Sequence, residues 1–429
     1  MKICIIGAGF TGLAAAYRLV KNGHDVTIIE ADKIPGGLAS GFKEKNWNWS
    51  LEKHYHHLFL TDKAIRKLAN EINYKLIVKR PITSTFYGGK INQIDSPISL
   101  LKFDQISFIS RLRTGVVLSI LKVIPFIKLM EKISVEDFIK KSMGISSWKV
   151  LWKPLLYKKF GKYSKLIPAS WFWARIKTRT SSLAYPKGGF LFFANSIVKK
   201  IKSSGGKIIF GQEVISLNED KNNNIWIKTK NGNVSVFDKV ICTLPVKHLE
   251  YIASQIPKSY FSNARRLKGL GAINLVLVLN KKFLPNGIYW LNINEAKFPF
   301  LCMVEHTNLV DSKYYNNKCV VYIGNYLESN HPYFNLNATN LLKQYIHHIH
   351  RIVPEFKTRY IDKTYIFKTP FAQPIITKNY SKNILPFSTP IKNLYLANIQ
   401  QVYPWDRGTN YAISLGFKVS SYVEGKKYD

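Results

Sequence analysis

"KICIIGAGFTG", from Lys2 to Gly12, decides the fold of this 429-residue chain. Its first residues form a short apolar strand pattern, and its last six have the glycine spacing GxGxxG. Apolar residues then recur at helical spacing as far as Gly23, and a second, β-branched segment ends at Glu30. The sequence therefore predicts that a strand, a helix and a second strand open the chain as a dinucleotide-binding βαβ unit.

Each glycine of this turn has its own physical task. Gly7 permits the tight turn, Gly9 lets the backbone approach a pyrophosphate, and Gly12 allows the helix to pack closely on the strand. The start of the helix offers unpaired amides and a partial positive charge to phosphates. Glu30 stands where an acid would hydrogen-bond a ribose hydroxyl, which favours FAD or NAD over NADP.

The composition indicates a folded protein of more than one domain. Hydrophobic residues make up 46% of the chain, enough for a large core, and 429 residues exceed the usual size of a single core. The four cysteines are scattered without CxxC spacing, which predicts buried thiols in a reducing compartment rather than disulfides or a metal site.

The N-terminus has no secretory pattern, so we expect a cytoplasmic protein. The most apolar segment, residues 115–130, is interrupted by Lys122, Pro125 and Lys128 and is too short to span a bilayer. The net charge of +37 would attract a polyanion, and an anionic membrane surface is a candidate partner. A lysine-rich genome composition is the alternative explanation. No nucleic-acid motif is present, so we expect no nucleic-acid partner.

Elements of different kinds interleave along the chain. Helical patterns cover residues 106–141 and 147–180, strands with a "KNGN" hairpin turn follow in residues 205–243, and a strand and a helix close the chain after residue 392. We therefore expect the cofactor domain to comprise residues 1–75, 184–250 and 386–429. Residues 76–183 would form a substrate-binding and helical region, and residues 251–385 a β-rich substrate domain.

A glycine pair after the second strand identifies the ligand class. The segment "IIEADKIPGGLAS", with Gly36 and Gly37, resembles the signature of the FAD-containing amine oxidase, phytoene desaturase and protoporphyrinogen oxidase superfamily. Four later segments resemble that superfamily in the same order, namely "AYPKGGF", "GQEVISL", "DKVICTLP" and "NLYLANIQQVYPWDRGTNYAISLG". The resemblance implies an α/β fold in which a Rossmann-like, glutathione reductase-like FAD domain is interleaved with a mixed-sheet substrate domain and a helical subdomain.

The resemblance also implies a set of FAD contacts. Val214 would meet the adenine through its backbone, and the amides from Gly408 to Tyr411 would face the flavin. The full set expected is Gly7, Gly9, Phe10, Thr11, Gly12, Glu30, Ala31, Gly36, Gly37, Leu38, Val214, Asn398, Gly408, Thr409, Asn410 and Tyr411. One departure from the pattern is Ala397 with Asn398, where the superfamily usually has Gly-Asp, so the loss of a charge predicts weaker FAD binding.

Three histidines crowd the segment "LEKHYHHLFLTD", residues 51–62. If the segment is extended, alternation puts His54 and His56 on one face and His57 on the other. A shared metal and a solvated cluster are two interpretations, but spacing suggests no third metal ligand, and we expect no metal site. We favour the flavin pocket, because "HHLFLTD" resembles a stretch of the UDP-galactopyranose mutases. His57 matches the first histidine of that stretch, whereas Leu60 replaces the second.

The catalytic candidates are His57, then His56, and Arg407. A histidine beside the flavin could position substrate or trade a proton near neutral pH. Arg407 precedes the last helix, and the alternative is that Asp406 and Arg407 only cap that helix. Arg175 and Arg179, among tryptophans, could bind a carboxylate or phosphate of the substrate, although snorkelling arginines are common on helices.

These features predict an FAD-dependent oxidoreductase that oxidises or desaturates a bulky, small-molecule or lipid-linked substrate by hydride transfer to flavin. Two alternatives are a flavin-dependent sugar-nucleotide mutase without net redox change and a catalytically silent FAD-binding protein. The substrate and the oligomeric state are left open.

Overall fold

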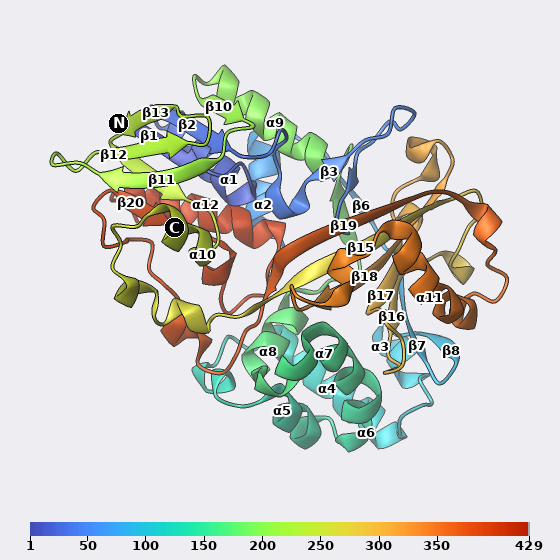
Figure 1. The fold of residues 1–429 in the computed structure, drawn as a ribbon. Coiled ribbons are helices and arrows are strands. Elements are labelled where there is room, and N and C mark those ends of the chain that lie inside the picture. The colour runs from blue at the N-terminus through green and yellow to red at the C-terminus, as the bar shows by residue number, and fades with distance from the viewer. Residues whose placement is uncertain (428–429) are drawn as a thin grey trace.

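The predicted βαβ unit opens the computed structural model, which describes residues 1–427 (Figure 1). It consists of β1 (Lys2–Ile6), α1 (Phe10–Lys21) and β2 (Asp25–Glu30), and the two strands pair in parallel. The sheet is completed by strands from the middle and the end of the chain. Its order is β10-β2-β1-β14-β20, with β10 at Lys207–Phe210, β14 at Lys239–Cys242 and β20 at Leu394–Leu396.

Helices from distant parts of the sequence pack around α1 beside this sheet. They are α2 (Lys63–Glu71), α9 (Phe190–Ser203) and the last helix, α12 (Thr409–Val423). Gly416 lets α1 and α12 touch, because a Cβ built there would lie 2.4 Å from the carbonyl oxygen of Thr11. The N-termini of α1 and α12 are thereby held at one end of the sheet.

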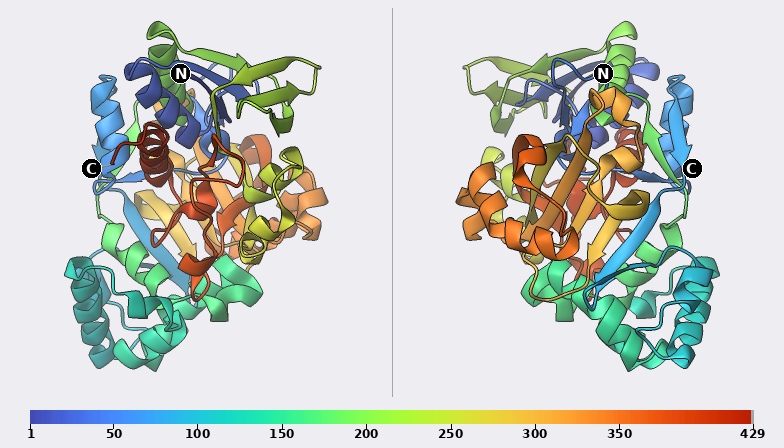
Figure 2. Two further views of the ribbon diagram at one scale, coloured as in Figure 1. Left: turned by 90° about the vertical axis from the view of Figure 1, so that its left-hand side faces the viewer. Right: turned by 90° about the vertical axis from the view of Figure 1, so that its right-hand side faces the viewer.

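A second, seven-stranded sheet lies beside the first in the order β19-β15-β18-β17-β16-β7-β8 (Figures 1 and 2). Its long strands alternate between two cores. Ile273 and Leu275 face α11 (Ala338–Ile352), whereas Ala272 and Val276 face the parallel-sheet half of the molecule. The strands are β7 (Ile82–Tyr87), β8 (Lys90–Gln93), β15 (Gly269–Leu279), β16 (Ile288–Ile293), β17 (Cys302–Glu305), β18 (Cys319–Leu327) and β19 (Ile361–Pro374).

The helical region lies at the opposite end of the molecule from the parallel sheet (Figure 1). It contains α3 (Pro97–Leu101), α4 (Phe108–Val123), α5 (Val135–Ser142), α6 (Ile145–Ser147), α7 (Lys153–Phe160) and α8 (Ala169–Thr178). Residues 147–180 do not form one helix, because a π-helical segment precedes α7 and a 3₁₀ segment separates α7 from α8. Among residues 1–427, no helix combines the length and the apolar character needed to cross a bilayer.

The remaining elements are short. The "KNGN" turn is confirmed, and it joins β12 (Ile225–Thr229) to β13 (Val234–Phe237), which pair with β11 (Val214–Glu219). The others are β3 (Gly41–Phe42), β4 (Leu51–Glu52), β5 (Leu58–Phe59), β6 (Leu76–Lys79), β9 (Leu183–Pro186) and α10 (Val246–Ile252). The four cysteines are buried and free.

Candidate functional site

The glycine turn is fixed by hydrogen bonds to both flanking segments. Gly7, at φ +103°, donates its N–H to the Ile29 carbonyl at 2.9 Å, and Gly36 donates to the Ala8 carbonyl at 2.9 Å. The carboxylate of Glu30 accepts from the backbone N–H groups of Ala8 (2.5 Å) and Asp32 (2.8 Å). Glu30 therefore holds the turn in shape as well as lining the space beside it.

Close backbone approach explains the other glycines of the motif. A Cβ at Gly12 would lie 2.0 Å from the Gly7 carbonyl oxygen, and one at Gly37 would lie 3.1 Å from Gly9 Cα. Side chains at these positions would push the turn, the first helix and the glycine pair apart. The packing role predicted for Gly12 is confirmed.

A cavity of about 810 Å³ extends from this turn into the space between the two sheets. One end is lined by the glycine turn, Glu30 and the glycine pair, and the other by His54, His56 and Arg407. Ile366, Phe367 and Phe371 of β19 add an apolar wall. This volume lies in the range typical of cofactor and ligand sites.

Two helix N-termini are open toward the cavity. α1 begins after Gly9 and α12 after Gly408, and neither N-cap residue provides a side-chain hydrogen bond. The first amides of both helices are therefore available to anionic groups, where the helix dipoles add a partial positive charge.

Most of the expected cofactor residues line the cavity, namely Gly7, Gly9, Phe10, Thr11, Glu30, Gly36, Gly37, Leu38, Asn398, Gly408 and Thr409. Ala31, Val214, Asn410 and Tyr411 are not among the lining residues, nor is Gly12. The side chain of Asn410 instead accepts from the amides of Ala64 and Ile65 at the start of α2. The amide of Tyr411 donates to the Gly408 carbonyl within α12, so it is not open as expected.

The three histidines face different surroundings, as the alternation predicted, although the backbone between β4 and β5 is irregular rather than a continuous strand. His54 and His56 line the cavity. His57 does not line it, and its Nδ1 lies 3.0 Å from the hydroxyl of Tyr289. His57, which we expected to be the first catalytic candidate, therefore lies behind His54 and His56, the two histidines that reach the cavity.

Hydrogen bonds orient both lining imidazoles. His54 lies between Asn274 Nδ2 at 2.5 Å and Thr369 Oγ1 at 2.8 Å. His56 Nδ1 donates to the His54 carbonyl oxygen at 2.6 Å, which leaves Nε2 of His56 as an acceptor. His54 carried no separate role in the sequence interpretation.

Burial keeps all three imidazoles neutral. It lowers the pKa of His54 to about 3 and that of His56 to about 4, and the positive charge of Arg407 adds to both effects. Burial likewise lowers the pKa of His57 to about 3, with Arg179 contributing. Proton exchange near neutral pH, one of the expected roles, is therefore not favoured in this arrangement.

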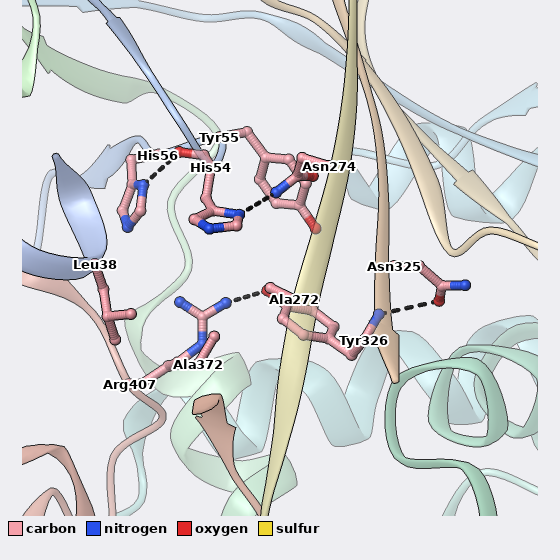
Figure 3. Close-up of a pocket in the computed structure, with 10 residues that line it drawn as sticks. All are labelled: Leu38, His54, Tyr55, His56, Ala272, Asn274, Asn325, Tyr326, Ala372 and Arg407. Atoms are coloured by element: carbon pink, nitrogen blue, oxygen red, sulfur yellow. Dashed lines mark hydrogen bonds between the residues drawn. The ribbon is translucent and has the colours of Figure 1, made fainter. Parts of the chain in front are cut away.

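A smaller cavity of about 20 Å³ lies directly behind His54 and His56 (Figure 3). It is large enough for one water molecule. Asn274 Oδ1 is buried there without a protein partner, and Tyr326 and Arg407 also line this small cavity. This polar corner adjoins the histidine end of the main cavity.

Arg407 is held by side chains rather than capping a helix. Its Nε donates to Gln373 Oε1 at 2.9 Å, and its guanidinium contacts the hydroxyl of Tyr326. The neighbouring Asp406 accepts from Lys159 at 2.9 Å and from Gln373 at 3.1 Å. The alternative that Asp406 and Arg407 only cap α12 is wrong, since α12 has no side-chain cap.

Positive charge is in excess around Asp406. Burial opposes its ionisation, but Lys159, Arg175 and Arg407 outweigh this effect and hold its pKa below the ordinary range. Arg175 lies 3.6 Å from the same carboxylate. Arg179 follows in the chain, and burial lowers its pKa to about 9. Neither Arg175 nor Arg179 lines the main cavity.

Asn398 uses both ends of its amide within the fold. Nδ2 donates to the Leu244 carbonyl oxygen at 2.9 Å, and Oδ1 accepts from the Gln400 amide at 2.9 Å. A carboxylate could not donate to Leu244. The departure from Gly-Asp thus has a local structural reason.

Several lining residues escaped the sequence interpretation. Asp32 and the segment 243–245 lie at the ends of predicted strands, and that position was the signal available for them, whereas Lys53 lies within the histidine segment. The β19 residues from Ile366 to Phe371 reach the cavity through long-range pairing with β15, and no local pattern marks them. Within residues 1–427, no three His, Cys, Asp or Glu side chains gather as a metal site would require.

Known proteins with related sequences and structures place the chain in a family. The profile of the flavin containing amine oxidoreductases matches residues 10–398. Zeta-carotene desaturase of Capsicum annuum is 27% identical over 182 residues, which are 37% of this chain and 31% of that protein. The chain thus spans about a third of the length of the two zeta-carotene desaturases it matches.

Two solved structures have the same fold over nearly the whole chain. A reduced UDP-galactopyranose mutase has a TM-score of 0.77 at 17% identity and covers 100% of this chain and 96% of its own. An oxidoreductase of Methanosarcina mazei has a TM-score of 0.76 at 19% identity and covers 99% of this chain and 100% of its own. The chain belongs to the flavin containing amine oxidoreductase family, and its cofactor is FAD.

The site residues fit this cofactor. The glycine pair lies close to the turn, since a Cβ at Gly37 would lie 3.1 Å from Gly9 Cα, and the open amides of α1 and α12 suit a pyrophosphate and an electron-rich ring edge. The carboxylate of Glu30 lies at the end of β2, where a ribose hydroxyl would be hydrogen-bonded.

Proposed function

We propose that the protein is an FAD-dependent oxidoreductase that oxidises or desaturates a bulky organic substrate by hydride transfer to flavin. One observation carries this proposal: a single cavity joins the dinucleotide cradle to an apolar wall and two neutral imidazoles. The names of two relatives, both zeta-carotene desaturases, agree with a bulky apolar substrate.

FAD, when bound, supplies the hydride acceptor, and the chain's own residues supply position and electrostatics. The amides of α1 would hold the phosphates, and the N-terminus of α12 would favour negative charge at the reactive end of the cavity. Ile366, Phe367 and Phe371 exclude water from the space where an apolar substrate would lie. Burial lowers the pKa of the two lining imidazoles to about 3 and about 4, so neither is suited to proton exchange near neutral pH.

His56 is the residue that we propose to position the substrate. Its Nδ1–H donates to the His54 carbonyl, so Nε2 is left to accept a hydrogen bond. The donor would be the substrate, or a water molecule that occupies the site before the substrate binds. His54 and Asn274 fix this geometry from behind. His57, hydrogen-bonded to Tyr289, supports the loop rather than touching substrate.

The test begins with the visible spectrum of the purified protein, which should show bound flavin that denaturation releases. Anaerobic mixing with apolar polyenes, amines and porphyrinogens should then bleach the flavin with one of these classes. His56→Gln should keep the FAD content and slow bleaching by about tenfold or more, whereas His57→Gln should slow it much less. Equal rates in wild type and His56→Gln would refute the role of His56.

A sugar-nucleotide mutase without net redox change is the second candidate, because positive charge exceeds negative charge beside His57. Arg175 shares the single carboxylate of Asp406 with Arg407 and with Lys159, whose pKa burial lowers to about 7, and Arg179 adds a further charge. A diphosphate would balance this excess. UDP-sugar turnover only after reduction of the flavin, abolished in Arg179→Gln, would support the mutase. A protein whose flavin neither bleaches nor supports turnover is the catalytically silent alternative.

A further inference from the structure

The outward face of α4 carries apolar side chains where a helix of a water-soluble domain carries polar ones. Six residues form this α4 outer face, and each is between 44% and 76% exposed: Phe108, Ile109, Leu112, Val116, Ile120 and Val123. At 100° per residue they fall within one third of the helix circumference, and Ser119 is the polar residue in that sector. A contiguous apolar surface of this kind marks an interaction site.

α4 is apolar on both faces, because Val117, Leu118 and Leu121 pack on the core opposite the α4 outer face. Two of its three buried residues are polar, Ser110 and Thr114, and Thr114 Oγ1 lies 2.7 Å from Ser147 Oγ of the neighbouring segment. An ordinary surface helix instead carries polar residues on its outward face. The side of α4 that faces away from the protein is therefore built for an apolar environment.

Basic residues border the α4 outer face. Residues 97–132 contain six lysines and arginines against two acids, and one of those acids, Glu131, is buried and accepts from Ser381. Arg111 and Lys122 lie on one side of the apolar sector and Arg113 on the other. Cations beside an apolar stripe complement anionic head groups above an acyl layer.

The length of α4 sets how it meets a bilayer. At 16 residues it is shorter than the roughly 20 residues needed to span the hydrocarbon core. It lies at the outer edge of the helical region, at one end of the molecule (Figure 2). A helix of this kind lies in the plane of the interface and inserts its apolar face.

We propose that the α4 outer face docks the protein on an anionic phospholipid bilayer, with α4 lying in the membrane plane. The docking surface is tied to the flavin site through α8. Lys177 of α8 donates to the carbonyls of Val123 and Ile124 at the end of α4, and Arg175 of α8 meets Asp406 beside the cavity. The inference does not depend on which substrate the cavity accepts.

The experiment uses the full-length protein with FAD bound and vesicles of phosphatidylcholine with or without phosphatidylglycerol. Wild type should float with the anionic vesicles at low salt, float less at high salt, and float weakly with neutral vesicles. The double variant Val116→Asp/Val123→Asp should reduce flotation at least about tenfold. Tyr251→Asp is the matched control, because Tyr251 of α10 is 80% exposed and lies outside α4, and it should bind as wild type does.

A label reports whether the α4 outer face itself inserts. All four native cysteines are buried, so Val116→Cys can be labelled selectively with a polarity-sensitive maleimide. Its emission should shift to the blue on anionic vesicles, whereas the same label on Tyr251→Cys should not shift. Absence of wild-type flotation at low salt would overturn the proposal. So would a dimer in solution that Val116→Asp/Val123→Asp converts to a monomer without any effect of vesicles, since the face would then bind a second copy.

Discussion

At the scale of single residues, Asn398 matters for the hydrogen bond that its side-chain amide donates, rather than for its lack of charge. We expect Asn398→Asp to lower the free energy of unfolding by about 2 kcal/mol at mildly alkaline pH, because a carboxylate would face the Leu244 carbonyl oxygen that Nδ2 now contacts at 2.9 Å. The variant should also lose FAD more readily, although it restores the acid usual in the superfamily. Urea unfolding and FAD retention on gel filtration would measure both effects.

The pH dependence gives this substitution a specific signature. An isolated buried carboxyl has a raised pKa, and once protonated it can donate to Leu244 as the amide does. The loss of stability in Asn398→Asp should therefore shrink as the pH falls. Asn263→Asp, at an exposed position, is the control. A penalty of equal size at all pH values would mean that shape, not charge, decides at this site.

At the scale of elements, the contact of α1 with α12 links packing to cofactor binding. Alanine normally stabilises a helix relative to glycine by about 1 kcal/mol. At Gly416 we expect the reverse, a loss of about 2 kcal/mol or more, because the new Cβ would lie 2.4 Å from Thr11 O and 2.8 Å from Ala14 Cβ. Separation of the two helices would also spread the amides that hold FAD, so Gly416→Ala should retain less flavin.

Gly115→Ala provides the matched control within α4. Its Cβ would meet Leu100 at 3.9 Å, an ordinary contact, so here the helix propensity should dominate and the variant should be as stable as wild type or more so. Thermal unfolding and flavin content of the two variants would be compared. Similar values for both would contradict a role of the α1–α12 contact in FAD binding.

The secondary-structure elements also show which parts of the fold can be predicted from the sequence. The βαβ unit could be predicted because the glycine spacing, the strand and the acid of Glu30 all lie within 30 residues of each other. The β19 wall could not, since its place follows from pairing with β15 almost 100 residues earlier. Alternation predicted that His57 faces away from His54 and His56. It could not predict the contact of His57 with Tyr289, because the two residues are 232 positions apart in the sequence.

At the scale of the whole molecule, neutral histidines buried between the two sheets should make the fold sensitive to acid. In the folded state, burial lowers the pKa of His54, His57 and His306 to about 3, and that of His56 to about 4. In the unfolded chain histidine titrates near about 6.5. Below that pH the unfolded state binds protons that the folded state cannot, so stability is lost as the pH falls, by up to about 1.4 kcal/mol per pH unit for each histidine.

Buried acids act in the opposite direction, and the pKa shifts of Glu52 and Asp62 are the largest among them, ahead of those of Glu30 and Glu305. Burial raises the pKa of Glu52 to about 7 and that of Asp62 to about 6, so their folded forms bind a proton more tightly than the unfolded chain does. Each stabilises the fold more at low pH, and that contribution is lost as the pH rises toward the folded-state pKa. Because the pKa shifts of the four histidines are together larger than those of these acids, we expect a net loss of stability and release of FAD on acidification from about pH 7 to about pH 5.

His306→Gln isolates one histidine from this balance. His306 is buried away from the cavity, and its Nε2 lies 2.8 Å from the hydroxyl of Tyr315, a bond that glutamine can replace. The slope of the unfolding free energy against pH should become shallower by about 1.4 kcal/mol per pH unit between about pH 6.5 and about pH 4.5. Urea unfolding at several pH values measures this slope, and His347→Gln, at an exposed position, should leave it unchanged. If the slope in His306→Gln equals that of wild type, His306 binds a proton as readily in the folded protein as in the unfolded chain. Burial would then not keep His306 neutral.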